Sequence, residues 1–511
     1  MKIRQLFYLT GFVFLFVCFL SGSCFAATYY VGTNGKDTNN GSLAAPWATL
    51  NRANAVAVSG DTVYVRGGIY NQKAYLDKAG VTWRAYTGEV PIIDGGWPGT
   101  LAGDSQGLPT GTDRYAALIF IVGSNITFDG FEVRNSRGRG IEVYGAPITN
   151  VTIRNCKAHH TFNESFLLIG GTKPTQWVTK SLVENCEFYN GAMIRPIYSS
   201  RADGTPGTVL VTRFDGLTFR KNKVHDSWYD GVLVGGNVTG DYSSANAIIE
   251  YNQIYGNYQD QLVLVGNRYN TVRYNLIYGT YPNANGENGR GSGIWFANET
   301  TWNLPNCYSE SHVYGNLIAN TLVNMWVEGQ GATCKIYNTY WYNNTSIEAT
   351  SSNFYIESWA GGGHIFKNNL VIQSAGSTRI GGAPSGVVTA NYNHWSRIPA
   401  STLCGRNDTT YPGYASTSPL TAKSTGWNSL RGASLTGKEF ALQSGSVCIR
   451  KGTTSPVTNP PQSFLNVGLS NFLTNVFNLV NQNATSWDIG GCVFSSQLSA
   501  PGAPYVASVT P

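Results

Sequence analysis

A short motif recurs through the middle of the chain and alternates apolar and polar positions in a fixed order. It consists of an apolar residue, two further residues, a small polar residue, one more residue and a second apolar residue. The polar position is occupied in turn by Asp129, Cys156, Cys186, Asn222, Asn252, Asn275, Asn316 and Asn369. These positions lie 27, 30, 36, 30, 23, 41 and 53 residues apart, and the last interval is long enough to hide a degenerate repeat near Asn338. Such a period indicates a repeat architecture.

A second apolar segment follows each polar position after about ten residues. Its residues alternate between apolar and polar, as a strand with one buried face requires. Examples are residues 140–144, 231–234, 261–264, 293–296 and 324–327. The repeat is too short for a helical crossover, and stacking such units buries their apolar faces in one continuous core. We therefore predict an all-β fold, a parallel β-helix with three short strands per coil, over residues 27–400.

The recurring asparagines are predicted to lie at one corner of every coil, where stacked amides hydrogen-bond to one another. Cys156 and Cys186 occupy the same corner in successive coils. They are therefore close enough either to form a disulfide or to stack as small buried apolar side chains. The sequence leaves both alternatives open.

The two ends of a β-helix need caps, because open ends expose strand edges and core. Residues 46–58 (PWATLNRANAVAV) predict a short amphipathic helix at the N-terminal end. Beyond residue 400 the repeat fades, so residues 401–511 are predicted to be an irregular C-terminal cap and tail. Within it, residues 464–479 predict an apolar helix, and Cys448 and Cys492 are candidates for a disulfide.

The N-terminus has the pattern of a secretory signal peptide, with Lys2 and Arg4 before an apolar run over residues 6–20 and small residues after it. We expect cleavage after Ala26. The apolar run is shorter than the roughly 20 residues that span a bilayer, so no stable membrane anchor is expected. A lipid anchor at Cys24 is the weaker alternative. The mature protein is predicted to be secreted or exposed at the cell surface.

Composition narrows the class of protein further. Only 13% of the 511 residues are charged, while the chain holds 59 Gly and 47 Asn, which argues against coiled coils and helical bundles. The formal charge of +6 falls to +4 once Lys2 and Arg4 are removed, and no long basic run exists, so nucleic acid is not an expected partner. No pair of CxxC motifs occurs, so structural zinc is not expected. A monomer is expected.

Several segments resemble secreted right-handed parallel β-helix proteins of the pectate-lyase-like superfamily. They are residues 29–37 (YYVGTNGKD), 46–50 (PWATL), 60–70 (GDTVYVRGGIY) and 488–491 (DIGG). The resemblance implies a right-handed helix and a place among polysaccharide lyases, glycoside hydrolases, epimerases, esterases and binding proteins. The Asn-Thr-Asp, Gly-His-Gly and Asp-Pro-His signatures of better-known branches are absent, as is an Asp-Asp pair for calcium. No family catalytic residue is therefore carried over.

One candidate site is a row of aromatic residues on the second strands of three late coils. By strand alternation Trp295, Trp326, Tyr355 and Trp359 point outward, with Glu328 and Glu357 beside them. Aromatic rings stack on the apolar faces of sugars, and carboxylates accept hydroxyl hydrogen bonds. This row predicts a carbohydrate-binding surface. The alternative is that a covering loop buries the rings as a satellite core.

A second candidate site is the segment 225–230 (HDSWYD), in which His225 and Asp230 lie near Asp260 of the next coil. Two carboxylates on adjacent coils suit acid–base chemistry or a Ca²⁺ ion, whereas ordinary turn capping is the structural alternative. In the inserted loop 279–292, Arg290 is a candidate to neutralise a uronate or to abstract a proton. His159, His160 and Glu164 are a weaker metal-binding candidate, with a solvated turn as the alternative.

We therefore predict a secreted β-helix protein that binds, and cleaves or remodels, an extended polysaccharide, acidic ones included. If it is an enzyme, a lyase or a hydrolase is expected, with catalytic candidates Asp230, Asp260, Glu328, Glu357 and Arg290. The substrate-binding candidates are Trp295, Trp326, Tyr355, Trp359 and His225. Ca²⁺ is the cofactor considered. The alternative is a non-catalytic carbohydrate-binding or structural protein of the cell surface.

Overall fold

The structure is a computed structural model that describes twelve stretches of the chain. They are residues 26–97, 115–145, 147–193, 207–235, 244–280, 291–298, 306–329, 335–357, 360–373, 379–380, 386–396 and 409–410. Their strands form three parallel sheets, named A, B and C in the order in which each coil visits them.

Sheet A has 14 strands and begins at the N-terminal end of the β-helix. Its strands are β1 (Thr28–Val31), β2 (Thr62–Val65), β5 (Thr82–Ala85), β8 (Thr127–Asp129), β11 (Ile148–Thr149), β12 (Thr152–Arg154), β15 (Val178–Glu184), β18 (Phe214–Arg220), β21 (Ala245–Glu250), β24 (Thr271–Arg273), β27 (Asn306–Tyr314), β30 (Lys335–Tyr342), β33 (His364–Lys367) and β36 (Val388–Asn391).

Sheet B has 13 strands. They are β3 (Gly68–Tyr70), β6 (Pro91–Asp94), β9 (Glu132–Ser136), β13 (Lys157–Thr161), β16 (Glu187–Tyr189), β19 (Lys223–His225), β22 (Gln253–Asn257), β25 (Leu276–Thr280), β28 (Leu317–Ala319), β31 (Thr345–Ile347), β34 (Leu370–Ile372), β37 (His394–Trp395) and β38 (Thr409–Thr410).

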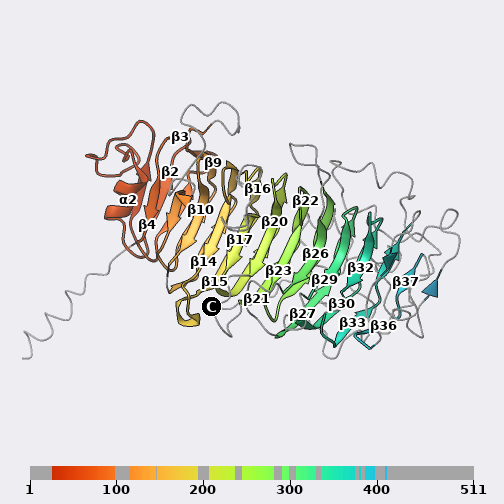
Figure 1. Cartoon of the computed structure of the whole chain (residues 1–511). Helices are drawn as coiled ribbons and strands as arrows, with labels where there is room; N and C mark the ends of the chain where they lie inside the picture. Colours follow the sequence, from red (N-terminus) through yellow and green to blue (C-terminus); the bar gives the residue numbers. More distant parts are fainter. Residues whose placement is uncertain are drawn as a thin grey trace, which may run out of the picture.

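Sheet C has 11 strands. They are β4 (Ala74–Leu76), β7 (Ala117–Ile121), β10 (Arg139–Tyr144), β14 (Phe166–Ile169), β17 (Gly207–Thr212), β20 (Asp230–Gly235), β23 (Leu262–Val265), β26 (Ser292–Ala297), β29 (Val323–Val327), β32 (Ser352–Ile356) and β35 (Arg379–Ile380). Figure 1 shows the strands side by side along one axis, with α2 at one end and β37 near the other. The predicted right-handed parallel β-helix with three strands per coil is confirmed.

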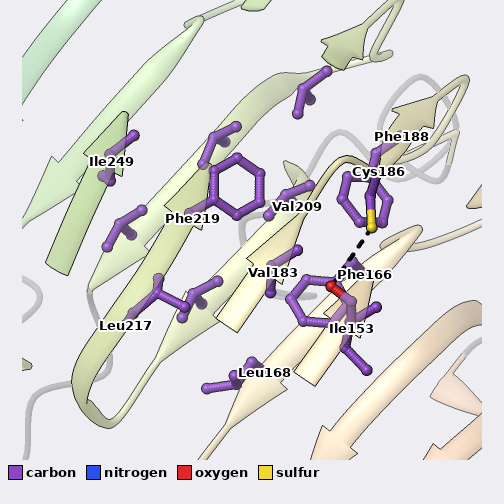
Figure 2. Packing of buried hydrophobic residues seen from close by; sticks show 14 of the residues in the cluster. Ile153, Phe166, Leu168, Val183, Cys186, Phe188, Val209, Leu217, Phe219 and Ile249 are labelled. Atoms are coloured by element: carbon purple, nitrogen blue, oxygen red, sulfur yellow. Dashed lines mark hydrogen bonds between the residues drawn. The ribbon is translucent and has the colours of Figure 1, made fainter. Parts of the chain in front are cut away.

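The core runs along the axis because each strand turns alternate side chains inward. On sheet C, for example, Ile294 and Phe296 of β26 are fully buried, whereas Trp295 between them is only half-buried. Figure 2 shows inward residues of neighbouring coils in one buried cluster, among them Phe166, Phe188 and Phe219 from the three sheets.

Cys156 and Cys186 lie in this core as free thiols, so the disulfide alternative is wrong and the apolar stacking alternative holds. The Cys186 thiol lies 3.7 Å from the Ile153 carbonyl oxygen, the contact drawn in Figure 2. Burial and the neighbouring Cys156 raise the pKa of Cys186 well above its usual value, so it stays protonated. Cys448 and Cys492 lie outside the described residues.

The predicted asparagine ladder occupies the corner between sheets A and B. Each side-chain amide donates to the side-chain oxygen of the next asparagine, at 3.2, 2.9, 2.9, 2.9, 3.0 and 3.1 Å. The members are Asn222, Asn252, Asn275, Asn316, Asn344, Asn369 and Asn393. The hidden repeat therefore exists, but its ladder residue is Asn344 and not Asn338.

The residue before each ladder position adopts a left-handed backbone, which lets the chain turn in two residues. Examples are Asn155 at φ 54°, Asn343 at φ 53° and Gly315 at φ 65°. Asparagine and glycine tolerate this region best, which explains part of the high Asn content. Lys221 and Tyr251 adopt it as well, at φ 57° and 58°, so the coil geometry overrides their local preference.

The prediction for the first repeat was wrong by two residues, because the corner residue is Phe131 and not Asp129. Asp129 pairs in register with Arg154 on sheet A, and Phe131 takes the place that Cys156 holds in the next coil. Asp129 points outward between two arginines, Arg84 and Arg154, each 3.0 Å away. The motif failed here because an apolar ring fills the corner, and the nearest polar residue was an ion-pairing one.

The N-terminal end is closed by α2 (Leu50–Val56), which is shorter than the predicted helix 46–58. Thr49 caps it by accepting a hydrogen bond from the Arg52 N–H, while Leu50 and Ala53 face the core. Trp47 is not helical, because it bridges to Val31 at the edge of sheet A. A 3-10 helix, η3 (Pro174–Gln176), lies before β15.

Several predictions fall outside the described residues. They are the signal peptide up to residue 25, the apolar helix 464–479 and, apart from β38, the C-terminal cap. Among the residues that the structure does describe, no helix is both long and apolar enough to cross a membrane.

Candidate functional site

The predicted aromatic row forms on the outer face of sheet C. Trp295, Trp326 and Tyr355 pair in register on β26, β29 and β32. The rings of Trp295 and Trp326 stack, with centroids 4.9 Å apart and planes 16° from parallel. Tyr355 lies 6.4 Å from Trp326 and is tilted by 58°. The stack therefore opens at Tyr355, where a ring can present part of its face to a ligand. Trp359 lies outside the described residues.

The row continues backward into an apolar ridge. The residues in register before Trp295 are Val263, Leu233 and Leu210 on β23, β20 and β17. Leu233 and Val263 are buried although they point away from the axis, and Trp295 packs against them. The satellite core that was the alternative to a binding surface therefore exists beside Trp295, while Trp326 and Tyr355 are half-buried.

Glu328 and Glu357 meet beside the open end of this row. Each directly follows its strand, and the last residues of those strands, Val327 and Ile356, pair in register. The Glu357 N–H donates to the Val327 carbonyl at 3.0 Å, so the two glutamates are vertical neighbours. One ladder step separates their backbones by about 4.8 Å. Both side chains are half-buried.

The protonation of Glu357 is shifted by its surroundings. Burial raises the pKa of Glu357 above its usual value, and the nearby Trp326 side chain opposes part of that rise. A carboxyl with a raised pKa keeps its proton to higher pH and suits proton donation. The arrangement can therefore supply a protonated acid next to a second carboxylate.

Asp230 and Asp260 are also neighbours in successive coils, but they lie where the strands of sheet C begin, whereas Glu328 and Glu357 lie where they end. The Asp260 N–H lies 3.3 Å from Asp230 Oδ1, and both residues are buried, at 4% and 2% exposure. Asp260 Oδ1 accepts hydrogen bonds from the Ser292 N–H at 2.6 Å and the Ser292 hydroxyl at 2.7 Å. This is the capping arrangement named as the structural alternative. A catalytic role for the two stays a prediction.

His225 does not join the aromatic row, because it ends β19 on sheet B. Its Nδ1 lies 2.7 Å from Asp226 and its Nε2 3.4 Å from Glu187. Burial alone lowers the pKa of His225, but its hydrogen bonds to Asp226 and Glu187 outweigh that effect and raise it. The chain turns the corner between β19 and β20, so His225 and Asp230 face different directions.

The structure reveals an aromatic column on sheet B that the motif search missed. His159, Tyr189, His225, Tyr255 and Tyr278 stack face to face in successive coils. Their centroids lie 4.4, 5.0, 4.9 and 4.9 Å apart, and no pair of planes deviates by more than 11°. Each ring comes three residues after a ladder position, and that regular spacing is the signal that would have found the column.

Metal ligands do not gather in the described part of the chain. No group of three or more His, Cys, Asp or Glu side chains there could hold a metal ion. Ca²⁺ takes six to eight oxygen ligands, whereas Asp230 and Asp260 supply two carboxylates and Asp260 Oδ1 already accepts from Ser292, so a Ca²⁺ site there stays a prediction. Glu164 binds Arg139 instead of joining His159 and His160. Arg290 lies outside the described residues.

Comparison with known proteins supports the architecture. Residues 29–247 match the family described as "Pel9A-like, right handed beta helix region". No curated protein matches the chain.

Solved structures with a similar fold have low sequence identity to the chain. A pectate lyase Pel9A is 16% identical, covers 93% of this chain and 98% of its own, and has a TM-score of 0.48. XylC in complex with xylose is 12% identical over 75% of this chain and 82% of its own, with a TM-score of 0.48. A rhamnogalacturonan lyase is 19% identical over 72% and 87%, with a TM-score of 0.43. These figures concern the fold alone.

Proposed function

Because the chain is a pectate-lyase-like right-handed parallel β-helix, we propose that it binds an extended polysaccharide on sheet C and cleaves it beside Glu328 and Glu357. The observation that supports this proposal best is the vertical pair of glutamates at the open end of the Trp295–Trp326–Tyr355 row. Aromatic rings and carboxylates together are what a sugar polymer requires of a binding surface.

The spacing of the pair favours hydrolysis with retention at the anomeric carbon. Retaining glycosidases hold two carboxyl groups about 5–5.5 Å apart, and a backbone step of about 4.8 Å between the two glutamates lets their carboxyl groups reach that separation. Glu357 donates its proton to the glycosidic oxygen while Glu328 attacks the anomeric carbon, so the leaving sugar departs with its hydroxyl. Glu357 then removes a proton from water, which displaces Glu328 and restores both groups.

The test uses Glu328→Gln and Glu357→Gln, each assayed on homogalacturonan, rhamnogalacturonan, alginate and xylan. New reducing ends report hydrolysis, absorbance of unsaturated products reports a lyase, and each assay is run with and without chelator. Both variants are expected to lose turnover by at least about a hundredfold while still binding polymer. Glu184→Gln is the matched control, because this glutamate is ion-paired to Arg220 on sheet A.

Other outcomes of this test reject the proposal in different ways. Full turnover in both variants would show that the glutamates are not catalytic. Unsaturated products would favour a lyase, and polymer binding without turnover in the wild type would favour a non-catalytic binding protein of the cell surface.

Export of the protein is part of the same proposal, because polysaccharides of this length lie outside the cell. It is supported by the charged start, the apolar run and the small residues of the first 26 positions. Sequencing the N-terminus of protein recovered from the medium is expected to give a chain that begins at Ala27. A chain that keeps Met1 would contradict the cleavage.

A further inference from the structure

Three aromatic side chains, two of them exposed and one half-buried, lie together at the N-terminal end of sheet C, far from the candidate site. Tyr75 is 51% exposed and Tyr144 is 48% exposed, whereas most large apolar side chains of the chain are buried. Phe120 lies between them, with its ring centroid 5.3 Å from Tyr75 and 6.0 Å from Tyr144. These residues come from β4, β7 and β10. We name the three residues Tyr75, Phe120 and Tyr144 the N-terminal platform.

The geometry of the platform differs from that of the stacked columns. In the sheet B column the planes of neighbouring rings are nearly parallel, so most ring faces are covered by other rings. In the platform both angles are close to 30°. In addition, β4 is the terminal strand of sheet C at this end, and among the described residues no further strand of that sheet covers Tyr75. The platform therefore offers ring faces to solvent.

The platform belongs to the same outward row as the candidate site. Tyr75 pairs in register with Phe120, Phe120 with Glu142, and the row then runs through Leu167 and Leu210 toward Trp295. Six ladder steps separate β7 from β26, which is about 29 Å at about 4.8 Å per step. An extended polymer lying along the helix axis would touch both surfaces, whereas a short oligosaccharide would reach only one.

Charged groups beside the platform are held in fixed positions. Arg139 donates to Glu164 at 2.8 Å and to Glu142 at 3.1 Å, and its guanidinium lies 5.2 Å from the Tyr115 ring centroid. Glu142 is the ladder neighbour of Phe120. Fixed polar groups beside aromatic rings are what a sugar-binding surface uses to orient its ligand.

We propose that the N-terminal platform is a second glycan-contact surface, which binds sugar rings of an extended polysaccharide about 34–38 Å from Glu328 and Glu357, seven and eight ladder steps from β7. This inference rests on the proposed function only for the polymer class. The platform would make affinity depend on chain length, because a polymer that reaches both surfaces binds twice in one molecule.

The test measures affinity in Glu357→Gln protein, so that cleavage does not remove the ligand. The probes are homogalacturonan, rhamnogalacturonan, alginate and xylan, each as long polymer and as tetrasaccharide, by affinity electrophoresis and calorimetry. The double variant Tyr75→Ala/Tyr144→Ala is expected to bind whichever of these polymers the Glu357→Gln protein binds about tenfold more weakly. It is also expected to lose the preference for polymer over tetrasaccharide. The double variant Tyr75→Phe/Tyr144→Phe, which keeps both rings, is expected to bind polymer as tightly as the protein without these substitutions.

The matched control is Tyr308→Ala, because Tyr308 is 50% exposed but lies on sheet A. Unchanged polymer affinity in the double alanine variant, or an equal loss in Tyr308→Ala, would overturn the inference. A wild-type dimer in sedimentation that the double variant abolishes would identify a second copy as the occupant and would also overturn it. Failure of all four polymers to bind the wild type would reject both proposals, whereas full activity of Glu357→Gln would reject only the catalytic assignment.

Discussion

Replacing Asn252 by alanine should show how much the asparagine ladder contributes to stability. Its amide donates to the Phe219 carbonyl and to Asn275 Oδ1, both at 2.9 Å. Its Oδ1 accepts from the Asn222 N–H at 3.0 Å and from the Asn222 amide at 3.2 Å. The side chain is buried at 1% exposure, so water cannot replace these partners.

The expected cost follows from the groups that lose their partner. The Asn222 N–H and the Phe219 carbonyl lose a buried hydrogen bond, and an orphaned buried group costs about 1–3 kcal/mol. The Asn222 amide still donates to the Val183 carbonyl, and Asn275 Oδ1 still accepts from the Asn252 N–H, so they add little. Asn252→Ala should therefore lower the free energy of unfolding by about 2–6 kcal/mol.

Urea denaturation followed by far-ultraviolet circular dichroism and by tryptophan fluorescence measures this loss. Coincidence of the two curves tests whether a single free energy describes the transition, as a repeat protein requires. Asn71→Ala is the control, because Asn71 is exposed and donates one hydrogen bond of 3.2 Å to the Asp94 carbonyl. If Asn252→Ala changes stability no more than Asn71→Ala does, the reasoning about the ladder is wrong.

Three further predictions concern protonation and the thiols. Glu357→Gln should raise the stability of the protein at neutral pH. A carboxyl whose pKa is raised in the folded state makes the protein less stable as pH increases through its unfolded and then its folded pKa. Melting temperatures of the wild type and the variant, measured from pH 4 to 8, should therefore diverge as pH increases, and an equal pH dependence in both would refute this. The His225 pKa measured by NMR should exceed 6.5 and should fall in Glu187→Gln; an unchanged value would contradict the ion pair. Non-reducing peptide mapping should recover Cys156 and Cys186 unlinked, and a linked peptide would refute the thiol stacking.

The fold could be predicted because residues that are neighbours in successive coils of a solenoid recur at a regular interval in the sequence. Asn222 and Asn252 are 30 positions apart yet share a hydrogen bond of 3.2 Å, as their equivalent places in the motif imply. The prediction failed where the corner residue is apolar, as at Phe131, because the pattern required a polar residue. It also placed the hidden repeat near Asn338, although Asn344 is the ladder residue.

For the candidate site, the sequence predicted which side chains of a single strand point outward, but not which strands lie on the same sheet. Alternation correctly placed Trp295 and Trp326 outward, because inward and outward positions differ by one residue. It could not assign His225, which lies five residues before Asp230 but on another sheet. That assignment depends on where the chain turns a corner, and the position of the corner is fixed by contacts between coils and not by local pattern.

An outward aromatic row in a β-helix is in itself ambiguous, because strands about 4.8 Å apart bring equivalent rings to stacking distance with or without a ligand. The Tyr189, His225 and Tyr255 rings illustrate the structural use, since their faces cover one another. A ligand can reach ring faces only where a stack ends or tilts. Tyr355 and Tyr75 meet that condition at opposite ends of sheet C, so substitutions there separate binding from stability more cleanly than substitutions within a stack.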